Sequence, residues 1–319
     1  MSVIASYILP GLPQPLLTPQ ANPGYGRLRD AFEKVRMEIE QSDADVLILY
    51  STMWPSVIGH QILSRPNPQW THVDEQFHDL GSIPYSFRID EELAKLYCEK
   101  AKARGLMTRT IDYHGFPIDT GSVVALKLIN PENRIPAIVL SSNVYADRAE
   151  TVVFAKAAKE ALEESGKKAI AIAISTLSNR LHQDWIDPKN DCIHSQKDEE
   201  WNQKLLEFLR AGRLEDVAQL SRQIHREARV HKVNNFKSMW WMASLMGAHN
   251  RYSGTVHAYE PVYGTGCAVV GLEPAEHAAR DLEFDEGSPE FFAGDRNVLA
   301  PSVGLSSQTT DPGQEGGGQ

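Results

Sequence analysis

The feature that most constrains the fold is a β-α-β unit in the middle of the chain. Ala137–Ser141 and Ala169–Ser175 are short, uninterrupted apolar runs, as expected of strands buried on both faces. Between them, Arg148–Ser165 has the alternating apolar and charged faces of an amphipathic helix, and Gly166 follows as a helix stop. Such a unit places its two strands parallel in one sheet, joined by a right-handed crossover. The pattern therefore predicts an α/β layer architecture.

The flanking sequence repeats this alternation of strand-like and helix-like segments. Hydrophobic periodicity predicts further strands at Val3–Leu9, Val46–Tyr50, Gly254–Tyr259 and Ala268–Leu272. It predicts helices at Tyr25–Gln41, Glu91–Arg104, Val123–Ile129, Lys197–Ala211, Leu214–Val230 and Phe236–Met246. Residues 276–319 are rich in Gly, Pro, Ser and acidic residues, a composition that buries little, so we expect a disordered tail there. The expected organisation is one α/β domain over 1–275 followed by that tail.

Composition excludes several classes of protein. The chain has 32 Lys and Arg against 42 Asp and Glu, a net charge of −10, which argues against binding the phosphate backbone of a nucleic acid. No apolar run approaches the roughly 20 residues that cross a bilayer. Met1–Ile4 has no basic segment and no cleavage pattern, so we expect a cytoplasmic protein. The three cysteines, an odd number, are widely spaced and predict no disulfide framework: Cys98, Cys192 and Cys267.

Three candidate site residues follow predicted strands. Gly11 comes after Leu9 and Pro10, Met53 after Val46–Tyr50, and Asn179 after Ala169–Ser175. Side chains just past the carboxyl ends of parallel strands commonly line the active sites of α/β proteins. An Asn amide there can hydrogen-bond a ligand, but it cannot act as an acid-base catalyst.

Two histidine-containing segments are candidates for metal or ligand binding. The first has five potential ligands within eight residues: His72, Asp74, Glu75, His78 and Asp79. We expect this segment to be a loop, in which such residues are commonly just solvated. The second is the polar stretch Asp112–Gly121, which contains His114 and in which Asp119 or Thr120 is positioned to cap the following helix.

His60 and Glu227 are each open to two interpretations. His60 follows the Met53 segment and could line a pocket at the same end of the sheet, or it could be a packed, hydrogen-bonded core histidine. Glu227 lies beside Arg226 on a predicted helix and is either a ligand or part of a surface ion pair.

Taken in order, several stretches resemble the class III extradiol ring-cleaving dioxygenases, and most closely their non-catalytic α-type subunits. They are Leu9–Pro15, Tyr50–Trp54, His72–Glu75, Asp112–Gly121, Thr176–Ser178, Glu227–Val230 and Tyr263–Gly266. The resemblance implies a single α/β domain with a mixed central sheet flanked by helices. From their places in the sequence, the candidate pocket-lining residues are His60, Asp74, His114, Thr120 and Asn179.

The resemblance further implies that the iron site of this chain is vestigial. In the family, Fe(II) is held by two histidines and a carboxylate with open positions for substrate and O2. The positions of the two histidines hold Gly11 and Met53, and that of a nearby proton-transferring histidine holds Asn179. Only the carboxylate has a counterpart, Glu227. No catalytic residue is therefore expected in this chain, and Fe(II) is expected in a partner, an iron-bearing β subunit within a heterotetramer.

Three functions remain open on this evidence. The first is an α-type subunit that supports a ring-cleaving β subunit acting on an aminophenol or a catechol-like aromatic. The second is a self-sufficient Fe(II) dioxygenase whose ligands have moved, for example to His60, His114 and Glu227. The third is a non-enzymatic protein of the same fold that binds an aromatic ligand.

Overall fold

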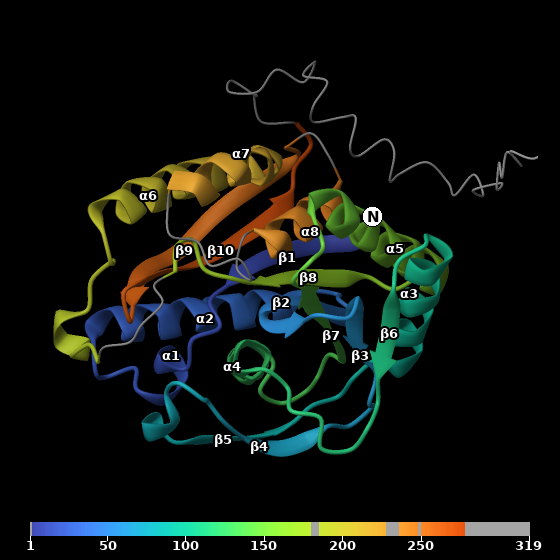
Figure 1. Cartoon of the computed structure of the whole chain (residues 1–319), viewed down its shortest axis with the longest axis horizontal. Helices are drawn as coiled ribbons and strands as arrows, with labels where there is room; N and C mark the ends of the chain where they lie inside the picture. Colours follow the sequence, from blue (N-terminus) through green and yellow to red (C-terminus); the bar gives the residue numbers. More distant parts are fainter. Residues whose placement is uncertain (1, 180–184, 228–235, 248–249, 278–319) are drawn as a thin grey trace, which may run out of the picture.

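The computed structural model describes residues 2–179, 185–227, 236–247 and 250–277, without the side chains of 222, 223 and 225–227. An eight-stranded sheet runs through the middle in the order β6-β3-β7-β2-β8-β1-β10-β9 (Figure 1). Its strands are β1 (Val3–Leu9), β2 (Val46–Ser56), β3 (His60–Leu63), β6 (Thr108–Ile111), β7 (Ala137–Asn143), β8 (Ala169–Ile174), β9 (Tyr252–Val262) and β10 (Thr265–Pro274). The predicted tail lies outside the described residues, apart from 276 and 277.

The central sheet is mixed, as expected. The four middle strands, β7, β2, β8 and β1, are parallel, whereas β10 runs antiparallel to both β1 and β9. All six residues of β8 are buried, which explains why it reads as an apolar run without alternation. Tyr263 and Gly264 both adopt positive φ, so the turn between β9 and β10 is a tight hairpin connection.

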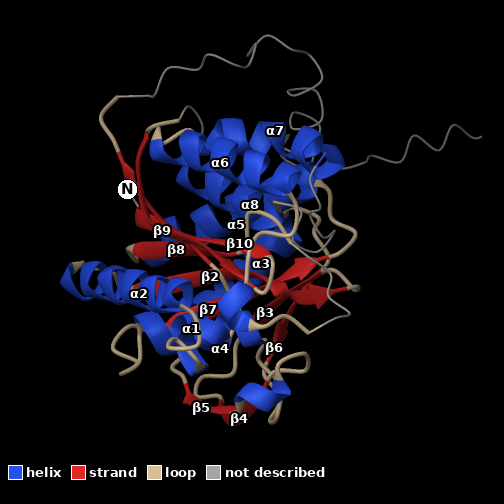
Figure 2. Cartoon of the chain, turned by 90° about the vertical axis from the view of Figure 1, so that its left-hand side faces the viewer, coloured by secondary structure: helices blue, strands red, loops and turns tan. Residues whose placement is uncertain are grey.

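Helices cover both faces of the sheet (Figure 2). One face carries α1 (Gln14–Leu17), α2 (Pro23–Gln41) and α4 (Thr120–Ile129), with a small hairpin of β4 (Gln69–Val73) and β5 (Ser82–Ser86) beyond them. The other face carries α3 (Glu91–Ala103), α5 (Arg148–Ser165), α6 (Gln196–Arg210), α7 (Leu214–Glu227) and α8 (Lys237–Met246). Two short 3₁₀ helices, His78–Leu80 and Pro188–Asn190, complete the described elements. No described helix combines the length and apolar character needed to span a bilayer.

Most predicted elements are confirmed, and one expectation was wrong. The predicted loop around His72 is the β4–β5 hairpin, and His72 itself lies in β4. That strand has no apolar alternation because four of its five residues are exposed. Its pairing with β5 and its packing near α4 therefore determine its structure more than local sequence does.

Candidate functional site

The carboxyl ends of β1, β2 and β8 lie together because these strands are parallel neighbours. Gly11 follows β1. Met53 lies in the irregular final part of β2, between Ser51 and Pro55, where the register with β7 shifts. The amino end of α4 packs against the same place, since Gly121 lies close to both residues. The fold therefore gathers two of the three positions that the resemblance marked as vestigial.

Gly11 is packed so tightly that no side chain fits on it. A Cβ atom at this position would lie 2.4 Å from Sδ of Met53 and 2.6 Å from Cα of Gly121. Van der Waals contact between such atoms begins near 3.5 Å. The Met53 thioether also lies over Gly121, where an added Cβ would meet Sδ at 2.8 Å. The space of the first expected histidine is thus filled by Met53 and by helix backbone.

Asp119, whose Oδ1 would lie 3.2 Å from a Cβ on Gly121, caps α4 and accepts three hydrogen bonds. It accepts hydrogen bonds from the Ser51 hydroxyl at 2.7 Å, the Ser122 amide at 3.0 Å and the Ser122 hydroxyl at 2.7 Å. The Ser51 hydroxyl oxygen in turn accepts from the Met53 amide at 3.2 Å. Of the two expected caps, Asp119 is therefore the N-cap, and it ties α4 to the end of β2.

Thr120, Asp74 and His72 form a hydrogen-bonded chain beside this cap. The Thr120 hydroxyl donates to Asp74 Oδ2 at 2.5 Å, so its oxygen is left to accept from His72 Nε2 at 2.7 Å. The other Asp74 oxygen accepts from the amides of residues 76 and 77. Glu75, His78 and Asp79 are exposed and do not join them. The chain fastens the hairpin to α4, and it leaves no carboxylate oxygen facing a vacant ligand position.

His60 and His114 lie in different layers of the protein. The ring of His60 is buried and stacks on Phe154 of α5 with centroids 4.1 Å apart. Its Nε2 donates to Glu150 at 3.0 Å, and this hydrogen bond lowers the pKa of the Glu150 carboxyl. His114 is exposed on the hairpin side, edge-on to Trp70. The relocated ligand set that paired these two histidines is therefore not assembled.

The last two predicted positions are Asn179, which is described in full, and Glu227, which is described only in its backbone. Asn179 is half-buried just after β8, where Ser178 accepts hydrogen bonds from Asn202 at 2.8 Å and from the Gly266 amide at 3.2 Å. Glu227 is the last residue of α7, and its side chain lies outside the described residues. Within the described part of the chain, no three His, Cys, Asp or Glu side chains are grouped so as to hold a metal ion.

Sequence reasoning missed Lys237, a cation in the core. It begins α8 with 1% of its surface exposed, and its Nζ donates to the carbonyls of Asn143 and Val144, the latter at 2.9 Å. Burial lowers the pKa of this ammonium to about 8. The sequence does place a lysine at the start of an apolar helix. This could have indicated a special role, because lysine is almost never fully buried without partners. Lys237 fixes α8 to the end of β7, next to the strand ends described above.

Comparison with known proteins identifies the family. Residues 11–271 match the model of the catalytic LigB subunit of aromatic ring-opening dioxygenases. The chain belongs to this family. It is 31% identical to the 2-aminophenol 1,6-dioxygenase alpha subunit of Pseudomonas sp. over 271 residues, which are 85% of this chain and 98% of that subunit. It is also 31% identical to the beta subunit of that enzyme over 286 residues, 84% of this chain and 93% of the subunit.

The fold agrees with this assignment. A crystal structure of an uncharacterised protein from Escherichia coli K12 superposes with a TM-score of 0.56 at 13% identity, covering 84% of this chain and 99% of that one. The expected resemblance and the expected mixed α/β domain are both confirmed.

The family's metal was tested against the residues present. Non-haem iron of the two-His-one-carboxylate type needs imidazole and carboxylate donors arranged on one face. At the strand ends, the described groups are a glycine without space for a side chain, a thioether and a carboxylate engaged by three donors. These residues do not fit Fe(II).

Proposed function

We propose that this LigB-family chain is the iron-free, α-type subunit of a two-subunit ring-cleaving dioxygenase. In this role it supports an iron-bearing β subunit and performs no catalysis itself. The substrate of the assembled enzyme is an aminophenol or a catechol-like aromatic. The complex is a heterotetramer.

The packing around Gly11 carries this proposal. A lost histidine alone could be an incidental substitution in an otherwise open site. Here the position is closed by two independent groups, the Met53 thioether and the Gly121 backbone, from β2 and α4. Close packing over this position supports a chain that has lost metal binding but has kept the fold.

The two relatives support a partner of the same fold. They are named as the alpha and beta subunits of one enzyme, and this chain is equally similar to both at 31% identity. The identity figures therefore do not choose between the two roles. The choice of the alpha role rests on the chemistry at Gly11 and Met53.

Co-expression tests this proposal. The chain, affinity-tagged, is produced alone and together with an iron-bearing LigB-family subunit from the same organism, and O2 uptake with 2-aminophenol is measured. We expect the partner to co-purify, the complex to consume O2 and the chain alone to consume none. We also expect the partner alone to inactivate roughly tenfold faster than the complex, because binding stabilises the folded state by mass action. Ring cleavage by the chain alone at the rate of the complex would refute the proposal.

A further inference from the structure

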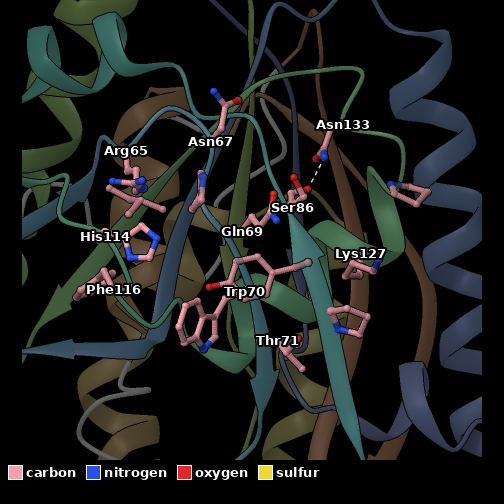
Figure 3. A pocket seen from close by; sticks show the side chains of 16 residues that line it. Arg65, Asn67, Gln69, Trp70, Thr71, Ser86, His114, Phe116, Lys127 and Asn133 are labelled. Atoms are coloured by element: carbon pink, nitrogen blue, oxygen red, sulfur yellow. Dashed lines mark hydrogen bonds between the residues drawn. The ribbon is translucent and has the colours of Figure 1, made fainter.

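An open pocket lies under the β4–β5 hairpin, away from the closed strand-end site. Its volume is about 1180 Å³, which is ample for a small organic ligand. It is bounded by the hairpin, the loop at 114–116, the segment after β3 and the end of α4 (Figure 3). Gly11 and Met53, which the resemblance places at the two iron histidines, do not line it, and neither does the α4 cap Asp119.

Two cations face this pocket from opposite walls. Figure 3 shows Arg65 beside His114 on one wall and Lys127 on the other. No Asp or Glu is among the lining residues, although the whole chain carries a net charge of −10. Among the described residues, neither Arg65 nor Lys127 has an ion-pair partner.

Each cation is held in position without being neutralised. Arg65 donates one hydrogen bond to the backbone carbonyl of Asp112 at 3.3 Å, which leaves most of its guanidinium donors available. Lys127 lies in the last turn of α4, where the helix dipole favours a positive charge. Both side chains are half-buried, so an anion bound here is screened less by salt than one on an open surface.

An aromatic surface also lines the pocket, next to His114. Trp70 is 54% exposed and meets His114 edge to face, with ring centroids 6.2 Å apart. In Figure 3 its indole lies below Arg65 and His114, and Lys127 lies to its right across the pocket. A half-exposed indole offers a flat face on which a conjugated ligand can stack.

We propose that this pocket binds a flat, conjugated dianion, of which an aromatic dicarboxylate is the simplest form. One carboxylate pairs with Arg65, the other with Lys127, and the ring between them stacks on Trp70. The inference is independent of the proposed subunit role, because it uses none of the residues on which that role depends.

Titration of benzene-1,4-dicarboxylate into the full chain tests the proposal, with calorimetry and tryptophan fluorescence as readouts. We expect saturable one-to-one binding. Arg65→Gln, Lys127→Gln and Trp70→Ala should each weaken it about tenfold, as expected for losing one charged hydrogen bond or one stacking surface. Matched controls are Lys34→Gln, an exposed lysine of α2, and Trp185→Ala, a tryptophan that is 74% exposed elsewhere. Both should bind as the wild type does.

The choice of ligands separates charge from shape. Benzoate should bind about tenfold more weakly, and the neutral benzene-1,4-dicarboxamide should not bind detectably. No saturable binding by the wild type, equal binding of the diamide, or binding that survives all three variants would overturn the proposal.

Discussion

Replacing Gly11 with Ala is expected to lower the free energy of unfolding by about 2–3 kcal/mol, the cost of forcing a methyl group into a filled core. The new Cβ would lie 2.4 Å from Sδ of Met53 and 2.6 Å from Cα of Gly121. The thioether is the end of a flexible side chain and can move, but the helix backbone cannot do so without shifting α4. Denaturant unfolding of the two proteins measures the difference directly.

A control glycine and a double mutant test whether the loss of stability comes from the packing around Gly11. Gly26→Ala is the control, because Gly26 lies inside α2 and an added Cβ meets nothing closer than 3.4 Å. Alanine there should be neutral or should stabilise by up to about 1 kcal/mol. In the double mutant Gly11→Ala/Met53→Ala, the loss of unfolding free energy should be about 1 kcal/mol smaller than the sum of the two single losses. Equal stability of Gly11→Ala and the wild type would show that the first histidine position is still open.

Replacing Lys237 with Ala is expected to cost about 3 kcal/mol of stability. The change removes buried methylene groups and leaves the carbonyls of Asn143 and Val144 without their donor. The control is Lys95→Ala, which removes an exposed lysine paired with Glu91 and should change stability by less than about 1 kcal/mol. A loss for Lys237→Ala no larger than that of the control would contradict the buried position of the ammonium.

The pH dependence of stability isolates the charge of Lys237. Its pKa in the folded protein is about 8 against an ordinary value of 10.5, so below pH 8 both states are protonated and the lysine adds no slope. Between these values the unfolded chain holds a proton that the folded chain has released, so rising pH favours folding. The stability of the wild type relative to Lys237→Met should therefore increase by up to about 3 kcal/mol from pH 8 to 10.5. A flat difference would show that the amine titrates as if it were exposed.

Sequence reasoning located the elements that carry their own local signal. The strands β1, β7 and β8 are largely buried and mostly apolar, β8 without a break, and α5 ends at the residue before a left-handed glycine, Gly166. The strands β3 to β6 have four or five residues each, and Pro84 even interrupts β5. Their pairing depends on distant segments, so a local window could not reveal them.

The site divides in the same way. The expectation that Gly11 and Met53 stand where the family has histidines came from the sequence, through the family resemblance. That the space at Gly11 is closed could not be predicted in this way, because Gly121 is 110 residues from Gly11 and reaches it only through the packing of α4. His60 illustrates the converse: its place in the sequence allowed a pocket position, but Phe154 and Glu150 hold it in the core.

The proposed role requires that this chain, although it has the fold of the LigB family, does not hold iron. The most direct test is the iron content of the purified chain after anaerobic loading with Fe(II) and removal of free metal, with an iron-bearing LigB-family subunit treated in parallel. We expect iron far below one atom per chain here and about one atom per chain in the parallel sample. Stoichiometric iron in this chain, resistant to gel filtration, would contradict it and would require ligands other than Gly11 and Met53.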